Sequence, residues 1–149
     1  MSHHLKYAWY LAKHKYWVFT EGVKRGLFFR VIIHDWDKFL PNRWNAYADF
    51  FYKEMTPEIK QHFMESWRVH ANRNDHHWQH WVAISDKGKM TPHEMSDKAR
   101  REMLADWISA HRAVGGTDLY AWYQGRAATI PLAPKTQEWI ENELLKGAA

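Results

Sequence analysis

The residues that break regular structure are few in this chain and fall at a handful of places. Its 149 residues include only seven glycines and five prolines, and the long stretches between them carry apolar residues at helical intervals. From about His4 to Lys24 these apolar residues are Leu5, Ala8, Trp9, Ala12, Tyr16, Phe19 and Val23, and Gly26 follows as a natural helix terminator. The sequence therefore predicts an all-α fold of long helices.

The same periodicity, together with capping residues, predicts the other helices. A second helix is expected over about 27–39, stopped by Leu40-Pro41, and a third over about 42–53. Thr56-Pro57 opens a fourth with a capping hydroxyl and a proline at the first helical position. Ser96 begins a strong helix that ends near Gly115, the run 85–89 is a polar turn, and further helices are expected over about 119–126 and 136–146.

Length and composition limit the architecture and the chemistry. A chain of 149 residues with 46% hydrophobic residues fits one well-packed core, so residues 1–149 are expected to form a compact single-domain bundle of about six to seven helices. The absence of cysteine excludes disulfides and thiolate chemistry, which leaves His, Asp and Glu as the strong metal ligands.

Charge and hydropathy predict the location and the partners. No stretch approaches the ~18 uncharged apolar residues of a membrane span, and the first residues lack the apolar run of a signal peptide, so we expect a cytoplasmic protein. The net charge of +4 comes from scattered basic residues. This distribution favours a small anionic substrate over nucleic acid.

One stretch carries the chemistry, and it runs from Val31 to Phe39. Three aliphatic residues lead into adjacent His34 and Asp35, and Lys38 follows. On a continuous helix, Lys38 would lie one turn from His34 on the same face, with Asp35 rotated about 100° away. An imidazole beside a carboxylate suits a divalent transition metal better than calcium.

Other histidines and one aspartate could complete a metal site from separate helices. They are His14 in the first helix, His70, His76 and His77 in the middle of the chain, and Asp106 in an apolar setting of a late helix. Alternatives exist: His14 lies among lysines as a surface residue would, and Asp106 could pair with Arg100, Arg101 or Arg112. The i, i+4 pair His76 and His80 could bind zinc separately, without the glutamate of a metalloprotease motif.

The order of these residues resembles the HD superfamily of metal-dependent phosphohydrolases. The aliphatic run, His34-Asp35, two residues and Lys38 match its signature, His14 matches the histidine of the preceding helix, and Asp106 matches the late aspartate. The chain is more similar still to short, uncharacterised phage and bacterial proteins that share an IHDxxKF…HHW…ADW layout. The resemblance implies an HD-like helical bundle.

The resemblance also implies roles for individual residues. His14, His34, Asp35 and Asp106 would hold one divalent ion (Mn, Fe, Zn, Co or Ni), and His70 with His76 or His77 would hold a second that Asp35 bridges. Asp35 could orient the water that such an ion activates, and Lys38 with Arg73 could offset charge on a transferring phosphoryl group. The implied substrate is a phosphate ester, of a nucleotide or a nucleotide-derived molecule.

Two other functions are compatible with the same residues. Some two-metal members of that superfamily are di-iron oxygenases, and the extra histidines permit this chemistry. A non-enzymatic interaction or nucleic-acid-binding protein could instead keep the metal site for stability. Its basic residues would then be clustered, whereas the pairs Lys24-Arg25 and Arg100-Arg101 are isolated here.

Overall fold

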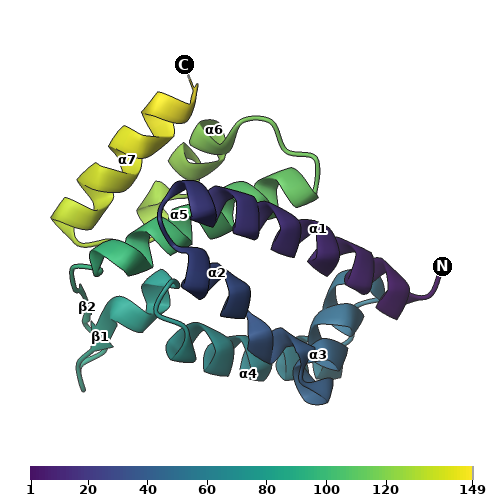
Figure 1. Ribbon diagram of the computed structural model, residues 1–149. Helices are drawn as coiled ribbons and strands as arrows, with labels where there is room; N and C mark the ends of the chain where they lie inside the picture. Colours follow the sequence, from purple (N-terminus) through teal and green to yellow (C-terminus); the bar gives the residue numbers. More distant parts are fainter. Residues whose placement is uncertain (149) are drawn as a thin grey trace.

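The computed structural model describes residues 1–148 as a mostly helical domain, which confirms the fold class predicted from the sequence (Figure 1). Within these residues there are seven α-helices: α1 (His3–Lys24), α2 (Phe28–Ile33), α3 (Pro41–Tyr52), α4 (Pro57–Arg73), α5 (Asp97–Ala113), α6 (Leu119–Gln124) and α7 (Pro134–Ala148). Three short 3₁₀ turns accompany them: η1 (Trp36–Phe39), η2 (Trp78–Trp81) and η3 (Ala127–Thr129). None of the helices in this part of the chain combines the length and apolar character needed to cross a membrane.

Helix α1 crosses the middle of the molecule and is packed against α5, α3 and the short α2 (Figure 1). Helix α4 packs on α3, while α6 and α7 pack on each other and on α5. One apolar cluster joins α5, α6 and α7, and a second joins α1 and α3. The four helices α1, α2, α4 and α5 enclose the polar cluster described below.

Capping residues mark the helix starts that the sequence predicts. The Thr56 hydroxyl accepts a hydrogen bond from the Ile59 N–H at 3.3 Å, and the Ser96 hydroxyl accepts one from the Ala99 N–H at 3.3 Å. Pro57 occupies the first turn of α4, as expected. Gly26 follows α1 at φ 73°, a left-handed conformation that favours glycine.

The continuous helix predicted over residues 27–39 is wrong. Helix α2 ends at Ile33, His34 leaves the helical conformation with φ −49° and ψ 128°, and Asp35 adopts the left-handed conformation with φ 55° before η1 begins. The Lys15 ammonium donates to the carbonyl oxygens of Ile32 at 3.1 Å and His34 at 2.7 Å, so it satisfies acceptors that the end of a helix leaves free. Aspartate tolerates the left-handed region better than most residues, which makes this break possible.

Most of the apolar residues whose spacing predicts α1 lie on its exposed side. The buried face consists of Tyr7, Leu11, His14, Val18, Glu21 and Gly22, which recur at helical spacing. The recurrent large apolar residues, Trp9 and Tyr16 among them, lie on the opposite side and are exposed. Two polar residues thus occupy the face of α1 that packs into the domain.

A small hairpin is absent from the sequence-based prediction. Strand β1 (Val82–Ile84) pairs antiparallel with β2 (Met90–Pro92), so that Ala83 lies opposite Thr91. The polar run 85–89 connects the strands, as the predicted turn does. Strands of three residues are too short to show a period-two pattern, which explains why they were missed.

Candidate metal centre

All the histidines and aspartates predicted as metal ligands lie together in one buried cluster. Helix α1 contributes His14, the break after α2 contributes His34 and Asp35, and α5 contributes Asp106. Helix α4 and the loop after it contribute the remaining three, which are His70, His76 and His77. Segments far apart in the chain therefore converge on one place, as in metal sites inside helical bundles.

The centre of this cluster is the fully buried carboxylate of Asp35. Its Oδ2 atom lies 3.4 Å from His34 Nε2 and 3.8 Å from His14 Nε2. Its Oδ1 atom lies 3.3 Å from His70 Nε2 and 3.2 Å from His76 Nε2. The two oxygens thus face two different groups of side chains, which is the arrangement that a carboxylate bridging two ions requires.

The first group comprises His14, His34, Asp35 and Asp106. Asp106 Oδ1 lies 3.2 Å from His14 Nε2 and 3.3 Å from His34 Nε2, and the distances to Asp35 Oδ2 complete the set. Four nitrogen and oxygen ligands at about 2.1 Å from a tetrahedral ion stand ~3.4 Å from one another. These four separations, of 3.2 to 3.8 Å, are close to that value, so the group could hold one divalent ion.

The second group comprises Asp35 with His70, His76 and His77. His77 Nε2 lies 2.9 Å from His70 Nε2, which itself lies 3.3 Å from Asp35 Oδ1. His77 therefore belongs to the group on the Oδ1 side of Asp35. The resemblance leaves open whether His76 or His77 joins His70; the structure brings both to the same group. Three imidazoles and one carboxylate are a donor set suited to zinc, iron, manganese or nickel.

Glu102 is a buried member of the cluster that the sequence analysis misses. It lies one turn before Asp106 on α5, and its Oε1 atom is 2.9 Å from His34 Nδ1 and 3.3 Å from His76 Nδ1. These contacts use the ring nitrogens that face away from Asp35, so Glu102 favours the tautomer in which each Nε2 is free to bind a metal. Arg30 donates to the second oxygen of Glu102. The spacing Glu102 to Asp106 is the sequence feature that could have identified it.

Asp37 plays the corresponding part for His70 and was missed as well. His70 Nδ1 lies 3.0 Å from both oxygens of Asp37, which is fully buried and also 3.1 Å from the Arg43 guanidinium. The Asn74 amide is 3.0 Å from the same ring nitrogen. Carboxylates that orient a ligating imidazole from behind are a regular part of protein metal sites.

Cationic neighbours lower the pKa values of the two buried aspartates in the cluster. Burial by itself would raise the pKa of Asp35, but His34 and Lys38 lower it well below its usual range. Burial likewise opposes ionisation of Asp106, yet His14 and His34 hold its pKa well below the usual value. Both carboxylates are therefore ionised at neutral pH. Burial opposes ionisation of His34, but Asp35 and Asp106 raise its pKa well above the usual value, so metal binding there would release a proton.

Unpaired buried atoms indicate that the cluster accommodates a cation. His14 Nε2, Asp35 Oδ1 and His76 Nε2 are buried and make no hydrogen bond of acceptable geometry within residues 1–148. Buried polar groups are normally paired, because leaving one unpaired costs about 1–3 kcal/mol. All three atoms point into the two ligand groups, so the residues present fit a metal ion.

The comparisons with known proteins concern almost the whole chain. A family of unknown function (DUF5662) matches residues 3–146. The chain belongs to this family. No curated protein and no solved structure matches the chain. Family membership thus leaves the activity open, and the buried cluster of this DUF5662 member is what indicates a metal site.

The alternative interpretations of individual residues are not supported in this family member. His14 is buried rather than a surface residue. Arg100 and Arg101 pair with Asp97, and Arg112 pairs with Glu21, so none of the three arginines is the partner of Asp106. His80 is exposed and contacts the Asn72 carbonyl oxygen, which places it outside the cluster.

The two predicted substrate-binding cations lie in different surroundings. The Lys38 ammonium lies 2.6 Å from Asp35 Oδ2, reached across η1 and not along a helix face. Burial would lower the pKa of Lys38, but Asp35 raises it well above the usual value, so this side chain stays charged. Arg73 is exposed at the end of α4, where its guanidinium lies 5.0 Å from the ring centre of Trp36.

Proposed function

We propose that this protein is a metal-dependent phosphohydrolase of the HD type that acts on a phosphate ester of a nucleotide or a small nucleotide-derived molecule. The observation that carries the proposal is the geometry of Asp35, whose two oxygens face two separate groups of His and Asp side chains with ligand-like spacing. The order of His14, His34-Asp35 and Asp106 along the chain supports the HD assignment.

Bound divalent ions would lower the pKa of a coordinated water toward ~7 and polarise a phosphoryl oxygen. Asp35, with its low pKa, would hold the attacking water in place by accepting a hydrogen bond. As the water oxygen bonds to phosphorus, the ester P–O bond would break, and the proton lost by the water would pass to the leaving oxygen, so that the alcohol and phosphate are released. Lys38 would donate to the phosphoryl oxygens while charge accumulates on them.

Two tyrosines beside Lys38 provide further donors. The hydroxyl groups of Tyr7 and Tyr47 are buried and make no hydrogen bond within the described chain, and the Lys38 ammonium lies 5.2 Å from the centre of the Tyr47 ring. Burial raises the pKa of both tyrosines above the usual value, so both hydroxyls stay protonated. In the proposed reaction they would help Lys38 hold the phosphoryl group.

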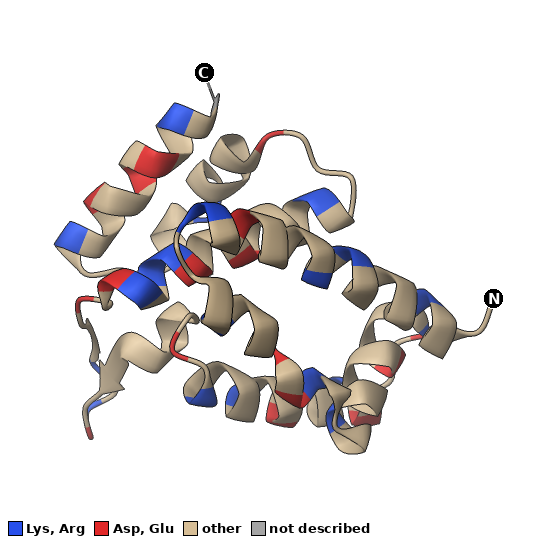
Figure 2. Ribbon diagram, in the orientation of Figure 1, with Lys and Arg blue, Asp and Glu red and all other residues tan. Residues whose placement is uncertain are grey.

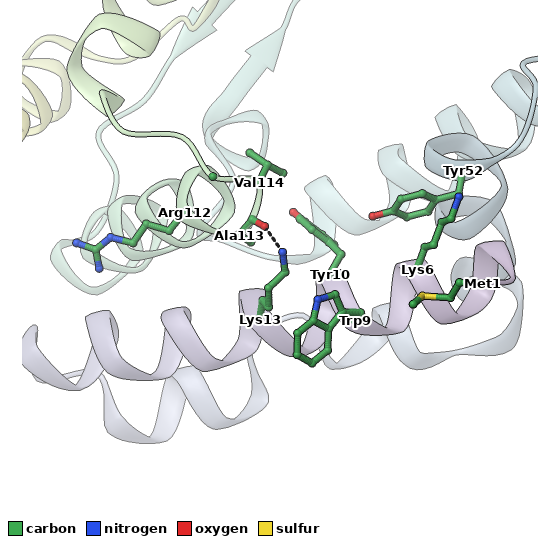
Figure 3. Close-up of a pocket in the computed structure, with 10 residues that line it drawn as sticks. Met1, Lys6, Trp9, Tyr10, Lys13, Tyr52, Arg112, Ala113 and Val114 are labelled. Carbon is green, nitrogen blue, oxygen red and sulfur yellow. Dashed lines mark hydrogen bonds between the residues drawn. The ribbon is translucent and has the colours of Figure 1, made fainter.

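A surface pocket of about 540 Å³ lies beside the cluster, and entry of a substrate from it would require the Tyr10 side chain to move (Figure 3). Tyr10, Trp9, Lys6, Tyr52 and Ala113 are among the residues that line it. The Tyr10 ring stacks on His14 at 5.9 Å between ring centres, so one side chain separates this pocket from the first ligand group. Asp106 and Lys38, each 13% exposed, are the members of the site closest to solvent. The pocket is large enough for a nucleotide-sized substrate.

A di-iron oxygenase is the second candidate, because two adjoining histidine-rich groups that share a carboxylate also suit two iron ions. The two functions differ in the metal retained and in the molecule consumed. Iron with oxygen consumption identifies an oxygenase, whereas phosphate release with any divalent metal identifies a hydrolase.

The decisive experiment measures metal content by elemental mass spectrometry on protein purified without chelator or affinity tag, followed by phosphate release from a nucleotide panel. We expect one or two equivalents of a transition metal and turnover of at least one nucleotide. His34→Ala should lose the metal and the activity. His80→Ala is the matched control, because that histidine lies outside the cluster, and it should retain both.

Two outcomes would contradict the proposal. Protein that stays metal-free after reconstitution with manganese, zinc or iron would make the cluster a structural hydrogen-bond network. Metal-loaded protein that consumes oxygen and releases no phosphate would favour the oxygenase instead.

A further inference from the structure

An exposed apolar row runs along the outer side of α1, opposite the face that carries His14. The row consists of six residues spaced by four, three, four, three and four positions: Leu5, Trp9, Ala12, Tyr16, Phe19 and Val23. All six are exposed, and the five large side chains keep between 41% and 65% of their surface accessible. Alternating steps of three and four are the heptad spacing of a coiled-coil seam.

Helix α2 extends this surface. It lies beside α1, where Val31 packs on Gly22 and the Phe28 ring lies 5.9 Å from that of Phe19. Its outer side presents four more apolar side chains that are between 49% and 82% exposed: Phe28, Phe29, Ile32 and Ile33. In Figure 2 this helix is mostly free of charged residues.

The area of the combined surface is that of a protein interface. From their exposed fractions, the nine large side chains on α1 and α2 present on the order of 1,000 Å² of accessible surface, against about 800 Å² per partner in a standard interface. The largest apolar patch on a monomeric protein is typically only about 300–600 Å². Such a surface indicates a partner that covers it.

The spacing of the row specifies which partner fits. It reads the same in both directions, so two antiparallel copies of α1 place Leu5 opposite Val23, Trp9 opposite Phe19 and Ala12 opposite Tyr16. Each pair combines the two kinds of core position of an antiparallel coiled coil, and the small Ala12 leaves room for Tyr16. We propose that this protein forms a two-fold symmetric dimer in which α1 packs antiparallel against α1 of a second copy, with α2 widening the interface.

The charged residues beside the row fit a protein interface better than a lipid surface. Lys13 donates to the Ala113 carbonyl oxygen at 2.5 Å, and Lys15 donates to the His34 carbonyl oxygen at 2.7 Å. Both lysines flank the centre of the row, and both are directed inward, away from any anionic headgroup. Exposed Lys6 and Lys24 flank only the two ends of the row, so its centre shows the depletion of free charge that is typical of interfaces between proteins.

The oligomeric state tests the proposal directly. Analytical ultracentrifugation at micromolar concentration should give twice the chain mass of 17.9 kDa. Trp9→Glu should raise the dimer dissociation constant on the order of 100-fold or more, because each interface would bury an unpaired charge from each chain. Leu145→Glu on α7 is the matched control, since Leu145, like Trp9, is a large exposed apolar residue on a helix but lies off this surface; this variant should remain dimeric.

Cross-linking tests the antiparallel orientation of the two α1 helices, and because the chain has no native cysteine, only the introduced thiols can react. Leu5→Cys and Val23→Cys face each other across the proposed interface, but each is about 27 Å from its own symmetry mate, from 18 residues at 1.5 Å rise. A short thiol cross-linker should therefore give covalent dimers of the double variant and none of either single variant.

Several results would overturn the proposal. These are a monomer at all concentrations, equal dissociation constants for Trp9→Glu and Leu145→Glu, and efficient cross-linking of a single-cysteine variant. A monomer that binds anionic lipid vesicles through Trp9 would assign the surface to a membrane instead.

Discussion

Replacement of Glu102 by glutamine should weaken metal binding although Glu102 need not touch a metal. The Glu102 carboxylate accepts from His34 Nδ1 at 2.9 Å and lies 3.3 Å from His76 Nδ1, so it holds one imidazole from each ligand group. A glutamine amide has one accepting oxygen and a donating NH₂ group. Oε1 faces both imidazoles and Oε2 accepts from Arg30, so the NH₂ group of glutamine meets a donor on either side. If it faces the imidazoles, their preferred tautomer and ring orientation are lost; if it faces Arg30, the rings keep only a neutral, weaker acceptor.

The size of the effect follows from comparable sites. Removal of a carboxylate that orients a ligating histidine typically lowers metal affinity about 10- to 100-fold, which equals about 1.4–2.8 kcal/mol at 1.4 kcal/mol per tenfold change. Glu102 serves two histidines, so we expect the upper part of this range. Arg30 also loses half of its charged partners, but Asp75 still binds its guanidinium, which limits the change in fold stability.

Competition titration of zinc or manganese against a chromogenic chelator measures this affinity. Asp97→Asn is the control, because it makes the equivalent change on the same helix at an exposed carboxylate. Its metal affinity should match that of the unmodified protein. An affinity of Glu102→Gln within about twofold of the control, with normal helicity, would refute the orienting role of Glu102.

Three further predictions concern other parts of the structure. Asp35→Asn should lose bound metal while keeping its helicity, as measured by circular dichroism. Asparagine is preferred to alanine here because it tolerates φ 55°. Full metal retention would contradict the bridging geometry. Hydrogen bonds from Arg25, Lys24 and Arg112 outweigh burial and lower the pKa of Glu21 from 4.5 to about 2, so its contribution is fully present above pH 4.5 and disappears as the pH falls through 2. Urea titrations of Glu21→Gln should therefore show a loss of about 1–2 kcal/mol at pH 7 and a difference near zero at pH 2, after allowance for solvent screening; a loss that does not depend on pH would argue against a charge effect. Gly22→Ala should lower the free energy of unfolding by about 1–3 kcal/mol, because a methyl group there overlaps with the Val31 side chain; an unchanged melting temperature would show that α2 can move away from α1 at little cost.

The sequence predicts most of the helices because their ends carry local information. Thr56-Pro57 and Ser96 fix the starts of α4 and α5 through hydrogen bonds within four residues, and these starts are confirmed. The end of α2 depends instead on Lys15, which lies 17 residues before the Ile32 carbonyl oxygen that it contacts. Contacts of that range leave no periodic trace in the sequence, so the break at His34 was not predicted.

The cluster was predicted more completely than the helix that carries its central residues. His34, Asp35 and Asp106 were identified by residue type and order, which survive an error in local backbone structure. Glu102 and Asp37 were missed because their partners are histidine Nδ1 atoms, and a sequence does not show which nitrogen of a ring faces a metal. The roles of Lys38 and Arg73 in binding a substrate remain predictions.

In α1, hydrophobic periodicity predicts the helix but not which of its faces is buried. A rotation of this helix by about half a turn would bury the row that contains Trp9 and expose His14, so two packings compete. Three features hold His14 inward: its contact with Asp106, the ion pair of Glu21 with Arg112, and the close packing of Gly22. Metal ligation by His14 would stabilise the observed packing, and a second copy of the chain would cover the apolar row that this packing leaves outside. The proposed metal centre and the proposed dimer interface therefore favour the same orientation of α1 from its two sides, and loss of either is expected to weaken the other.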